Sequence, residues 1–457
     1  LRAHFFDKGT PGMIGITAFG ERRGMIRFVT ILVMGIALWA GAVTAVEAPL
    51  IRDGEELTLE RCIEIAVHNQ PEIIQYLYMT RANEADLGKA LSGYYPQLDA
   101  KSIFNSYNLA NKTDDPYPPI NNLYGYKYGD TNLTLTQKIY DFGKREDNVA
   151  VARLNVDSSR MDMENRITAV VNTVKNAYYD VLKAKLSRDI EVEVREQYRK
   201  QLEQAKLFFT AGKKPKYDVT NAEVYLSGAE LKLIDGENEL SKAWVSLSKA
   251  MGYDGPANYT VKELHNLDKL RIAEQEALER AYGNRQDLQS LLLQKKAAER
   301  SVSLARKDYF PSLDANAGYE FAGSQTPLAQ GWNVGVGVTW NLFAGFATQQ
   351  SVQKALANLK VTEAKIAAIK LQIRQEVQTS LLNMKKAEES ITNAQLLVRQ
   401  ATENLELVNL RYQSGLATSV EVTTATVNFS QAKQTRVNAY YNYVTARANL
   451  EKAMGGR

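Results

Sequence analysis

The most regular apolar pattern in the chain runs from residue 384 to residue 412. Apolar residues recur there at alternating intervals of three and four, which makes four unbroken heptads of Met384, Ala387, Ile391, Ala394, Val398, Ala401, Leu405, Val408 and Tyr412. Strict heptad spacing is typical of a coiled coil, whereas an amphipathic helix in a globular core drifts off a seven-residue repeat. Because one seam position holds alanine in three successive heptads, we expect a coiled coil whose helix axes approach closely.

Proline placement extends this prediction to long helices. All eleven prolines lie outside residues 120–214 and 328–457. Proline is poorly tolerated in a helix interior because it removes a hydrogen bond and clashes with the preceding turn. In the first window we predict a helix from about residue 149 to 211, roughly 95 Å long at 1.5 Å per residue. Its apolar residues recur at intervals of four, at Val174, Tyr178, Leu182, Leu186 and Ile190.

Each predicted long helix ends at a turn that contains glycine. The two turns contain Gly212 and Gly415, and helical sequence resumes after them as far as Met251 and Met454. Glycine is the usual residue where a helix ends in the left-handed backbone conformation. We therefore predict one long helical hairpin in each half of the chain.

Other segments change to a period of two. From Trp332 to Leu342 one face carries tryptophan, valine and leucine while the other carries glycine, asparagine and threonine, and residues 312–321 alternate similarly. In a soluble sheet the apolar face would meet a core. Alternation over about ten residues with aromatic residues at the ends is also typical of an outer-membrane barrel. In that case Trp332, Val336 and Trp340 form a membrane-facing belt.

The first half shows a weaker version of this pattern in residues 96–109 and 126–140. Residues 111–123 between these two segments contain three prolines and predict an exposed loop. Four strands can neither close a barrel nor hide their own edges. We therefore expect each subunit to contribute four transmembrane β-strands to a barrel that other subunits complete.

The order of helices and strands follows a duplication. Residues 249–252 (Lys-Ala-Met-Gly) return at 452–455, a shift of 203, whereas residues 95–100 return in similar form at 310–315, a shift of 215. The difference of 12 residues lies between these motifs, and we place it in the 111–123 loop. A repeat of this length predicts a duplicated unit packed on its copy rather than a solenoid. We expect a first repeat at 46–252, a linker at 253–271 and a second repeat at 272–457.

The N-terminal residues predict export. Residues 28–39 are an uncharged, mostly apolar run that follows three arginines, with small residues at 43–45. This is the pattern of a secretory signal peptide and is too short for a membrane span. We expect residues 1–45 to be a signal peptide with upstream residues. They carry five basic and two acidic residues, so without them the net charge falls from +4 to +1, which does not favour nucleic acid as a partner.

No residue pattern points to catalysis. The single cysteine, Cys62, excludes an internal disulfide, and we expect no N-terminal lipid anchor. The histidines are isolated, and the sequence contains neither a phosphate-binding loop nor a Cys/His metal spacing. We expect a non-enzymatic protein without a cofactor or metal. The alternative to a membrane channel is a periplasmic coiled-coil adaptor or scaffold protein, which would lack paired membrane hairpins.

Taken together, these residues give the chain a resemblance to the TolC-type outer-membrane efflux family. The resemblance covers about residues 57–455, and its most specific segment, residues 411–422, looks like the family's periplasmic tip. It implies a mainly α protein with a small β part, which forms a homotrimer with a twelve-stranded β-barrel in outer-membrane lipid and an α-helical coiled-coil tunnel. It also implies an exit duct for efflux or type I secretion. The periplasmic end of the duct would close as an iris and dock a periplasmic adaptor that carries an inner-membrane pump.

The resemblance further implies the site residues. Glu421 and Asp218 match acidic positions near the periplasmic constriction, where threefold symmetry makes each a ring that favours cations. An acid in the first turn of a helix is also favoured by the helix dipole, so this alternative stays open. A second acidic ring in some relatives falls here at Thr424, so we expect weaker cation selectivity. A basic residue that helps to lock the closed state in some relatives falls at Ala417, which leaves the closing contacts open.

The resemblance also places the adaptor-docking tip. The tip comprises Gly212, Lys213, Lys214, Lys216, Arg411, Tyr412, Ser414, Gly415, Leu416 and Ala417. Its three lysines would either meet an acidic adaptor surface or form a solvated turn.

Overall fold

The computed structural model describes residues 51–107, 126–255, 258–263, 270–323 and 328–456. The predicted signal peptide, the predicted loop at 111–123 and part of the predicted 253–271 linker lie outside these residues. All described residues belong to one compact unit of residues 49–457. Across this described part of the chain, no helix combines the length and the apolar character needed to cross a lipid bilayer.

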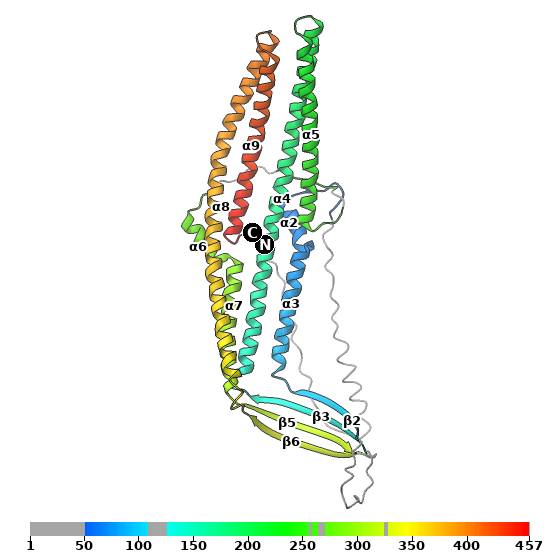
Figure 1. The fold of residues 1–457 in the computed structure, drawn as a ribbon, viewed down its shortest axis with the longest axis vertical. Helices are drawn as coiled ribbons and strands as arrows, with labels where there is room; N and C mark the ends of the chain where they lie inside the picture. Colours follow the sequence, from blue (N-terminus) through cyan, green and yellow to red (C-terminus); the bar gives the residue numbers. More distant parts are fainter. Residues whose placement is uncertain (1–50, 108–125, 256–257, 264–269, 324–327, 457) are drawn as a thin grey trace, which may run out of the picture. The chain divides into compact units, whose positions relative to one another are not determined.

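Two long helical hairpins dominate the unit (Figure 1). The first consists of α4 (Lys144–Thr210) and α5 (Lys216–Met251), and the second of α8 (Ala347–Gln413) and α9 (Ser419–Ala453). α4 and α8 each have 67 residues, which is about 100 Å at 1.5 Å per residue. The hairpins predicted from proline placement and glycine turns are confirmed.

Shorter helices lie beside the long ones at the end of the helical layer that is nearest the sheet. α3 (Pro71–Ser92) packs on α4, and α7 (Gln286–Arg306) packs on both α4 and α8. Towards the hairpin turns, α9 takes the place of α7 between α4 and α8, and α5 takes the place of α3 beside α4. α4 therefore has helix neighbours on two sides, while α3, α5 and α8 form the edges of the layer. The remaining short elements are α2 (Leu59–Asn69), α6 (Glu274–Asn284), the paired strands β1 (Glu56–Leu57) and β4 (Thr260–Val261), and the 3-10 helix η1 (Lys307–Tyr309).

The heptad prediction for α8 is confirmed. All nine predicted seam residues are buried or half-buried, and Ala394 and Ala401 are only 2% and 8% exposed. Ala401 and Leu405 pack against Phe429 of α9. The stripe predicted for α4 was wrong at one residue, because Leu186 is 38% exposed. Ile190, four residues further along the stripe, is 7% exposed, so the loss of burial is confined to Leu186.

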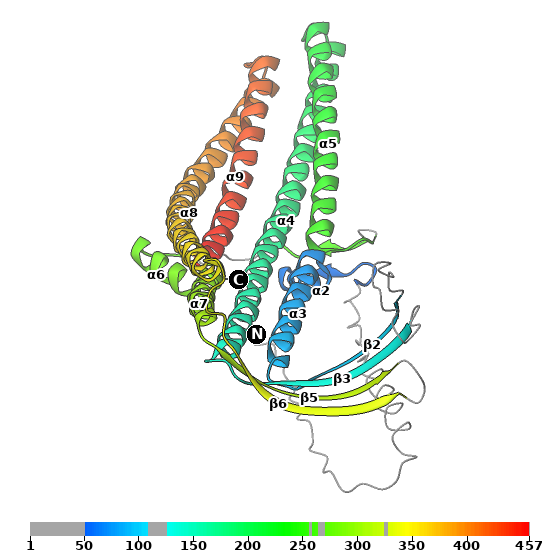
Figure 2. The same cartoon turned by 60° about the horizontal axis from the view of Figure 1, so that its bottom comes forward.

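The sheet contains four antiparallel strands in the order β2-β3-β5-β6 (Figure 2). The strands are β2 (Gln97–Tyr107), β3 (Tyr126–Tyr140), β5 (Ser312–Gly323) and β6 (Ala329–Thr339). Eighteen residues separate β2 from β3 and five separate β5 from β6. The extra residues of the first repeat therefore fall between β2 and β3, where the sequence placed them.

The strand register separates an apolar face from a polar one. Leu98, Leu135, Ala317 and Val334 form one row across the sheet, and the adjacent row on the other face is Asp99, Thr134, Gly318 and Asn333. Within the unit, the apolar face of β6 is uncovered. Trp332 and Val336 are 77% and 69% exposed.

The last predicted strand was shifted by three residues. β6 runs from Ala329 to Thr339 rather than from Trp332 to Leu342. Its partner β5 begins at Ser312, which pairs with Thr339, so within the described part of the chain no strand pairs with residues beyond Thr339. Trp340 lies past the end of the strand, where its indole Nε1 donates to the carbonyl oxygen of Tyr309 at 3.0 Å.

The repeated glycine of the Lys-Ala-Met-Gly motif marks the same joint in both repeats. Gly252 has φ +65°, and a Cβ on it would lie 2.9 Å from the carbonyl oxygen of Asn69, between α2 and α3. Gly455 has φ +78°, and a Cβ there would lie 2.8 Å from the carbonyl carbon of Asn284, between α6 and α7. The end of each hairpin therefore packs against a helix junction that leaves no room for a side chain.

Candidate functional site

The candidate site is the pair of turns that close the two hairpins. Gly212 and Gly415 have φ values of +66° and +75°. The amide of the following residue donates back to the helix in both turns, from Lys213 to Phe208 and from Leu416 to Arg411, at 2.8 Å. These are the hydrogen bonds of a glycine-terminated helix. Arg411 also donates from Nη2 to the carbonyl oxygen of Leu416 at 3.2 Å, and the hydroxyl of Ser414 donates to the carbonyl oxygen of Leu410.

Glu421 is an exposed carboxylate that caps its own helix. Its Oε1 accepts hydrogen bonds from the backbone amide and the hydroxyl of Thr418, both at 3.1 Å, and the hydroxyl of Thr418 accepts from the amide of Glu421. This is a capping box. The hydrogen bonds from Thr418 and the charge of Arg411, whose Nη1 lies 3.7 Å from Oε2, lower the pKa of Glu421. Thr424, three residues further on, is also exposed.

Asp218 holds the equivalent position in the first turn but has a different environment. It is 7% exposed, and its Oδ1 accepts a hydrogen bond from the hydroxyl of Ser419 at 2.9 Å. Gln201 of α4 donates to the hydroxyl of Thr423 at 3.2 Å. The two hairpin turns are therefore tied to each other through Asp218 and Ser419. The sequence did not indicate Ser419 or Gln201, since their partners are more than 200 residues away along the chain.

Tyr412 fills the space between the turns. It is 1% exposed, and its ring lies 5.8 Å from the ring of Phe208. Burial and the charge of Asp218 raise the pKa of Tyr412. The ammonium of Lys214 lies 5.5 Å from the centroid of the tyrosine ring, a cation–π contact. Ala417 is buried against Tyr412, so this predicted tip residue lies inside the second turn.

Polar contacts also join the two hairpins along α4 and α9. Glu193 pairs with Lys433 at 2.5 Å, Asn172 donates to Asn449 at 3.1 Å, and Lys175 pairs with Glu451 at 3.0 Å. The same contact also buries apolar side chains, since Val437 and Val444 of α9 belong to one hydrophobic cluster with Val174 of α4. The two hairpins are therefore joined by both polar and apolar contacts.

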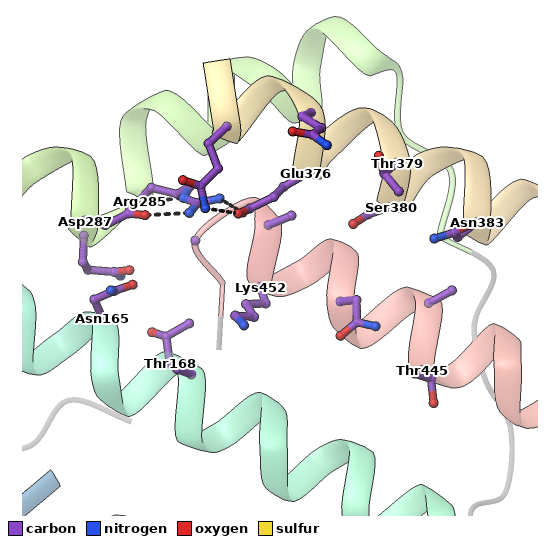
Figure 3. A pocket seen from close by; sticks show the side chains of 18 of the residues that line it. Asn165, Thr168, Arg285, Asp287, Glu376, Thr379, Ser380, Asn383, Thr445 and Lys452 are labelled. Carbon is purple, nitrogen blue, oxygen red and sulfur yellow. Dashed lines mark hydrogen bonds and ion pairs between the residues drawn. The ribbon is translucent and has the colours of Figure 1, made fainter. Parts of the chain in front are cut away.

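A polar cavity of about 1340 Å³ lies among α4, α8 and α9 at the start of α7 (Figure 3). Amide, hydroxyl and charged side chains from these helices point into it. Arg285 pairs with Asp287 at 2.6 Å and with Glu376, which ties the start of α7 to α8. Within the described ranges, no group of three or more His, Cys, Asp and Glu residues is placed to hold a metal ion.

Duplicated helical hairpins that continue into a sheet with an uncovered apolar face define a subunit of an outer-membrane channel. Residues 62–253 and 277–456 match the model of the outer membrane efflux protein family, and the chain belongs to this family. It is an outer-membrane efflux channel protein that extends into the periplasm. The family is that of outer-membrane channels, which are non-enzymatic transporters.

Curated relatives and solved structures agree with this assignment. Protein CyaE of Bordetella pertussis is 23% identical over 329 residues, which are 69% of this chain and 67% of the relative. The outer membrane protein TolC of Vibrio cholerae is 22% identical over 407 residues, which are 85% of this chain and 89% of the relative. The structure of the Campylobacter jejuni CmeC outer membrane channel matches the fold with a TM-score of 0.78 at 19% identity, covering 87% of this chain and 85% of that one.

Proposed function

We propose that three copies of this chain form a continuous exit duct from the periplasm through the outer membrane, for efflux or type I secretion. Each copy contributes four strands to a twelve-stranded barrel and four helical segments to a tunnel. The tunnel ends at the hairpin turns, where it docks a periplasmic adaptor that carries an inner-membrane pump. The observation that carries this proposal is the set of uncovered apolar stripes on the two edge helices, α5 and α8.

The stripe on α5 has a seven-residue spacing that Asn238 interrupts once. It consists of Tyr217, Val224, Leu231 and Val245, which are 63%, 64%, 65% and 70% exposed. Val224 and Leu231 each lie two residues after a buried alanine that packs against α4. Two residues correspond to about 200° around a helix. The stripe therefore faces away from α4, on the outer side of the hairpin.

The stripe on α8 has the same relation to its own seam. Leu396 follows the buried Ala394 by two residues, and Leu382 and Leu410 lie fourteen residues on either side of Leu396. These three leucines are 69%, 42% and 60% exposed in chain order. The heptad positions between these leucines hold Glu389 and Glu403, so the row on α8 is apolar only at every second heptad. Apolar rows on opposite edges of one layer suit a head-to-tail interface, in which α5 of one copy packs against α8 of the next.

The edges of the sheet require the same arrangement. β2 and β6 are the outer strands and have one partner each within the chain. An uncovered edge strand exposes a row of unpaired amide and carbonyl groups, which a closed barrel removes. A threefold axis that relates the copies would cover both sheet edges and both helix edges. It also gives an even number of strands, as in bacterial barrels. In this barrel Trp332, Val336 and Trp340 face lipid, and the polar row through Asp99 faces the lumen.

We further propose that Glu421 forms the charged ring at the periplasmic constriction, with Thr424 one turn behind it. Asp218 contributes less charge to the pore because it is buried against Ser419. The duct opens when the second hairpin moves away from the first, which breaks the Asp218–Ser419 contact and the polar contacts between α4 and α9. The two hairpins belong to the sequence repeats at 46–252 and 272–457, joined by 253–271, which we propose as the domains of the chain.

The stripe on α5 provides the test. Leu231→Glu should reduce the trimer seen by heat-modified migration of outer-membrane fractions, because it loses about 1–2 kcal/mol of apolar burial at each of three interfaces and places a charge there. The matched control is Val427→Glu on α9, which is 47% exposed and lies on a helix flanked by both α8 and α4. Equal amounts of trimer from the two variants would contradict the proposed assembly.

A further inference from the structure

We propose that the two hairpin turns of each chain are not equivalent docking sites, and that the first turn, residues 212–216, binds an acidic segment of a partner protein that approaches end-on. This inference rests on the proposed function, because it specifies the chemistry of the partner that meets the periplasmic tip.

The two turns differ in charge although their backbones repeat. Lys213, Lys214 and Lys216 of the first turn correspond, at the shift of 203, to Leu416, Ala417 and Ser419 of the second. Leu416 is 71% exposed, whereas Ala417 and Ser419 are buried. The surface of the first turn is therefore basic, and that of the second is apolar and neutral.

The positive charge of the first turn is not neutralised within the chain. Among the residues that the structure describes, Lys213, Lys214 and Lys216 have no ion pair. Asp218, the acid nearest to them in sequence, is buried and accepts its hydrogen bond from Ser419. At the second turn, in contrast, Arg411 lies 3.7 Å from Glu421, so the two charges offset each other.

The position of the lysines favours an end-on partner over a neighbouring copy. Lys213 and Lys214 lie between the end of α4 at Thr210 and the start of α5 at Lys216. A copy that packs along the α5 stripe reaches Tyr217 and the residues beyond it. The apex of the turn remains open to a molecule that approaches along the hairpin axis (Figure 1).

Charge complementarity identifies the partner as acidic, and the placement of the lysines favours a protein over a lipid surface. Segments that bind anionic lipid carry their basic residues on an amphipathic helix or beside a membrane span, whereas these lysines lie on a short turn between two helices. Exposed charges of this kind set the association rate and its salt dependence. A partner with glutamate or aspartate at its own tip should therefore select the first turn over the second.

The experiment uses the purified full-length trimer and two synthetic helical-hairpin peptides that are identical except for glutamates or glutamines at their turn. The glutamate peptide should bind at least about tenfold more tightly at ~0.05 M salt, and the difference should shrink as salt shortens the Debye length. The double variant Lys213→Glu, Lys216→Glu should abolish the difference. The control, Lys354→Glu with Lys365→Glu, changes the same charge on exposed residues of α8 and should retain it.

Each other outcome overturns the inference. Equal binding of the two peptides, or binding of neither, means that the turn does not recognise acidic protein. Preferential binding of the trimer to phosphatidylglycerol vesicles, lost in the double variant, assigns the lysines to lipid. A reduced amount of trimer in the double variant assigns them to a neighbouring copy. Failure of the wild-type chain to form a trimer would instead refute the proposed function.

Discussion

Glu421→Gln tests the electrostatic role of the tip without altering its fold. Glutamine can replace glutamate in a capping box, because its carbonyl oxygen accepts the hydrogen bonds that Thr418 donates to Glu421. The substitution removes one negative charge per subunit and retains the helix start. Glu421→Ala would remove the cap as well and would confound charge with local unfolding.

The expected size of the effect follows from Coulomb's law. If each carboxylate of the ring lies ~7 Å from the pore axis, it stabilises a monovalent cation on the axis by about one RT in water, and three carboxylates by about three. Screening at 0.1 M salt, with a Debye length of about 10 Å, halves this energy, so the three carboxylates raise the cation enrichment about fourfold relative to the same pore without them. At 1 M the Debye length is about 3 Å and the enrichment falls to about 1.3-fold.

The assay is the reversal potential across a planar bilayer under a salt gradient. The Glu421→Gln channel should show weaker cation selectivity than the wild type at 0.1 M salt and the same selectivity at 1 M. Arg411→Gln should act in the opposite direction, because it removes the positive charge 3.7 Å from Glu421. Thr424→Asp should also increase selectivity, since it adds a ring one turn away.

The pH dependence has a defined sign. The hydrogen bonds from Thr418 hold the pKa of Glu421 below its ordinary value, so Glu421 becomes protonated at a lower pH than an unperturbed glutamate. Cation selectivity should therefore be lost on acidification at a lower pH than an unperturbed glutamate would give. An unchanged reversal potential for Glu421→Gln at low salt would refute the assignment of this residue to the constriction.

Three further predictions concern the framework. Ala401→Leu should overpack the seam against Phe429 and cost about 1–3 kcal/mol in thermal unfolding; equal loss from Leu at the exposed control position Gln400 would refute the tight seam. Val336→Arg should cost about 2–4 kcal/mol of insertion because Val336 lies on the proposed lipid face, whereas Gly337 lies on the opposite face of the sheet; normal assembly of only the Val336→Arg variant in outer-membrane fractions would show that the facing is reversed. Gly252→Ala should destabilise the chain more than Gly54→Ala in thermal unfolding, because both have positive φ but only Gly252 has backbone close to the new Cβ, 2.9 Å away; equal costs would show that the junction between α2 and α3 shifts to make room for the new Cβ.

The sequence could predict elements whose pattern depends on a single contact face. The heptads of α8 and the alternation in the strands both indicate which side of a helix or strand is covered. Such a periodic pattern can be recognised from the residue types alone. The duplication relates the two halves of the chain. The Lys-Ala-Met-Gly motif and the glycine turn of one half could therefore be matched with their counterparts in the other half. The predicted α4 stripe failed at Leu186, which is exposed although Ile190 of the same stripe is buried, and β6 ended early because its partner strand begins at Ser312.

The difference between Asp218 and Glu421 was decided only by the tertiary structure. The repeat makes the two acids equivalent along the chain, since both lie six residues past a turn glycine. In the folded unit, Asp218 is buried against Ser419, 201 residues away, while Glu421 stays exposed and caps its own helix. Local sequence determines which residues start a helix, because capping involves neighbours within one turn. Burial depends instead on which hairpin packs beside that turn, and this is fixed by contacts between the two halves that no local pattern records.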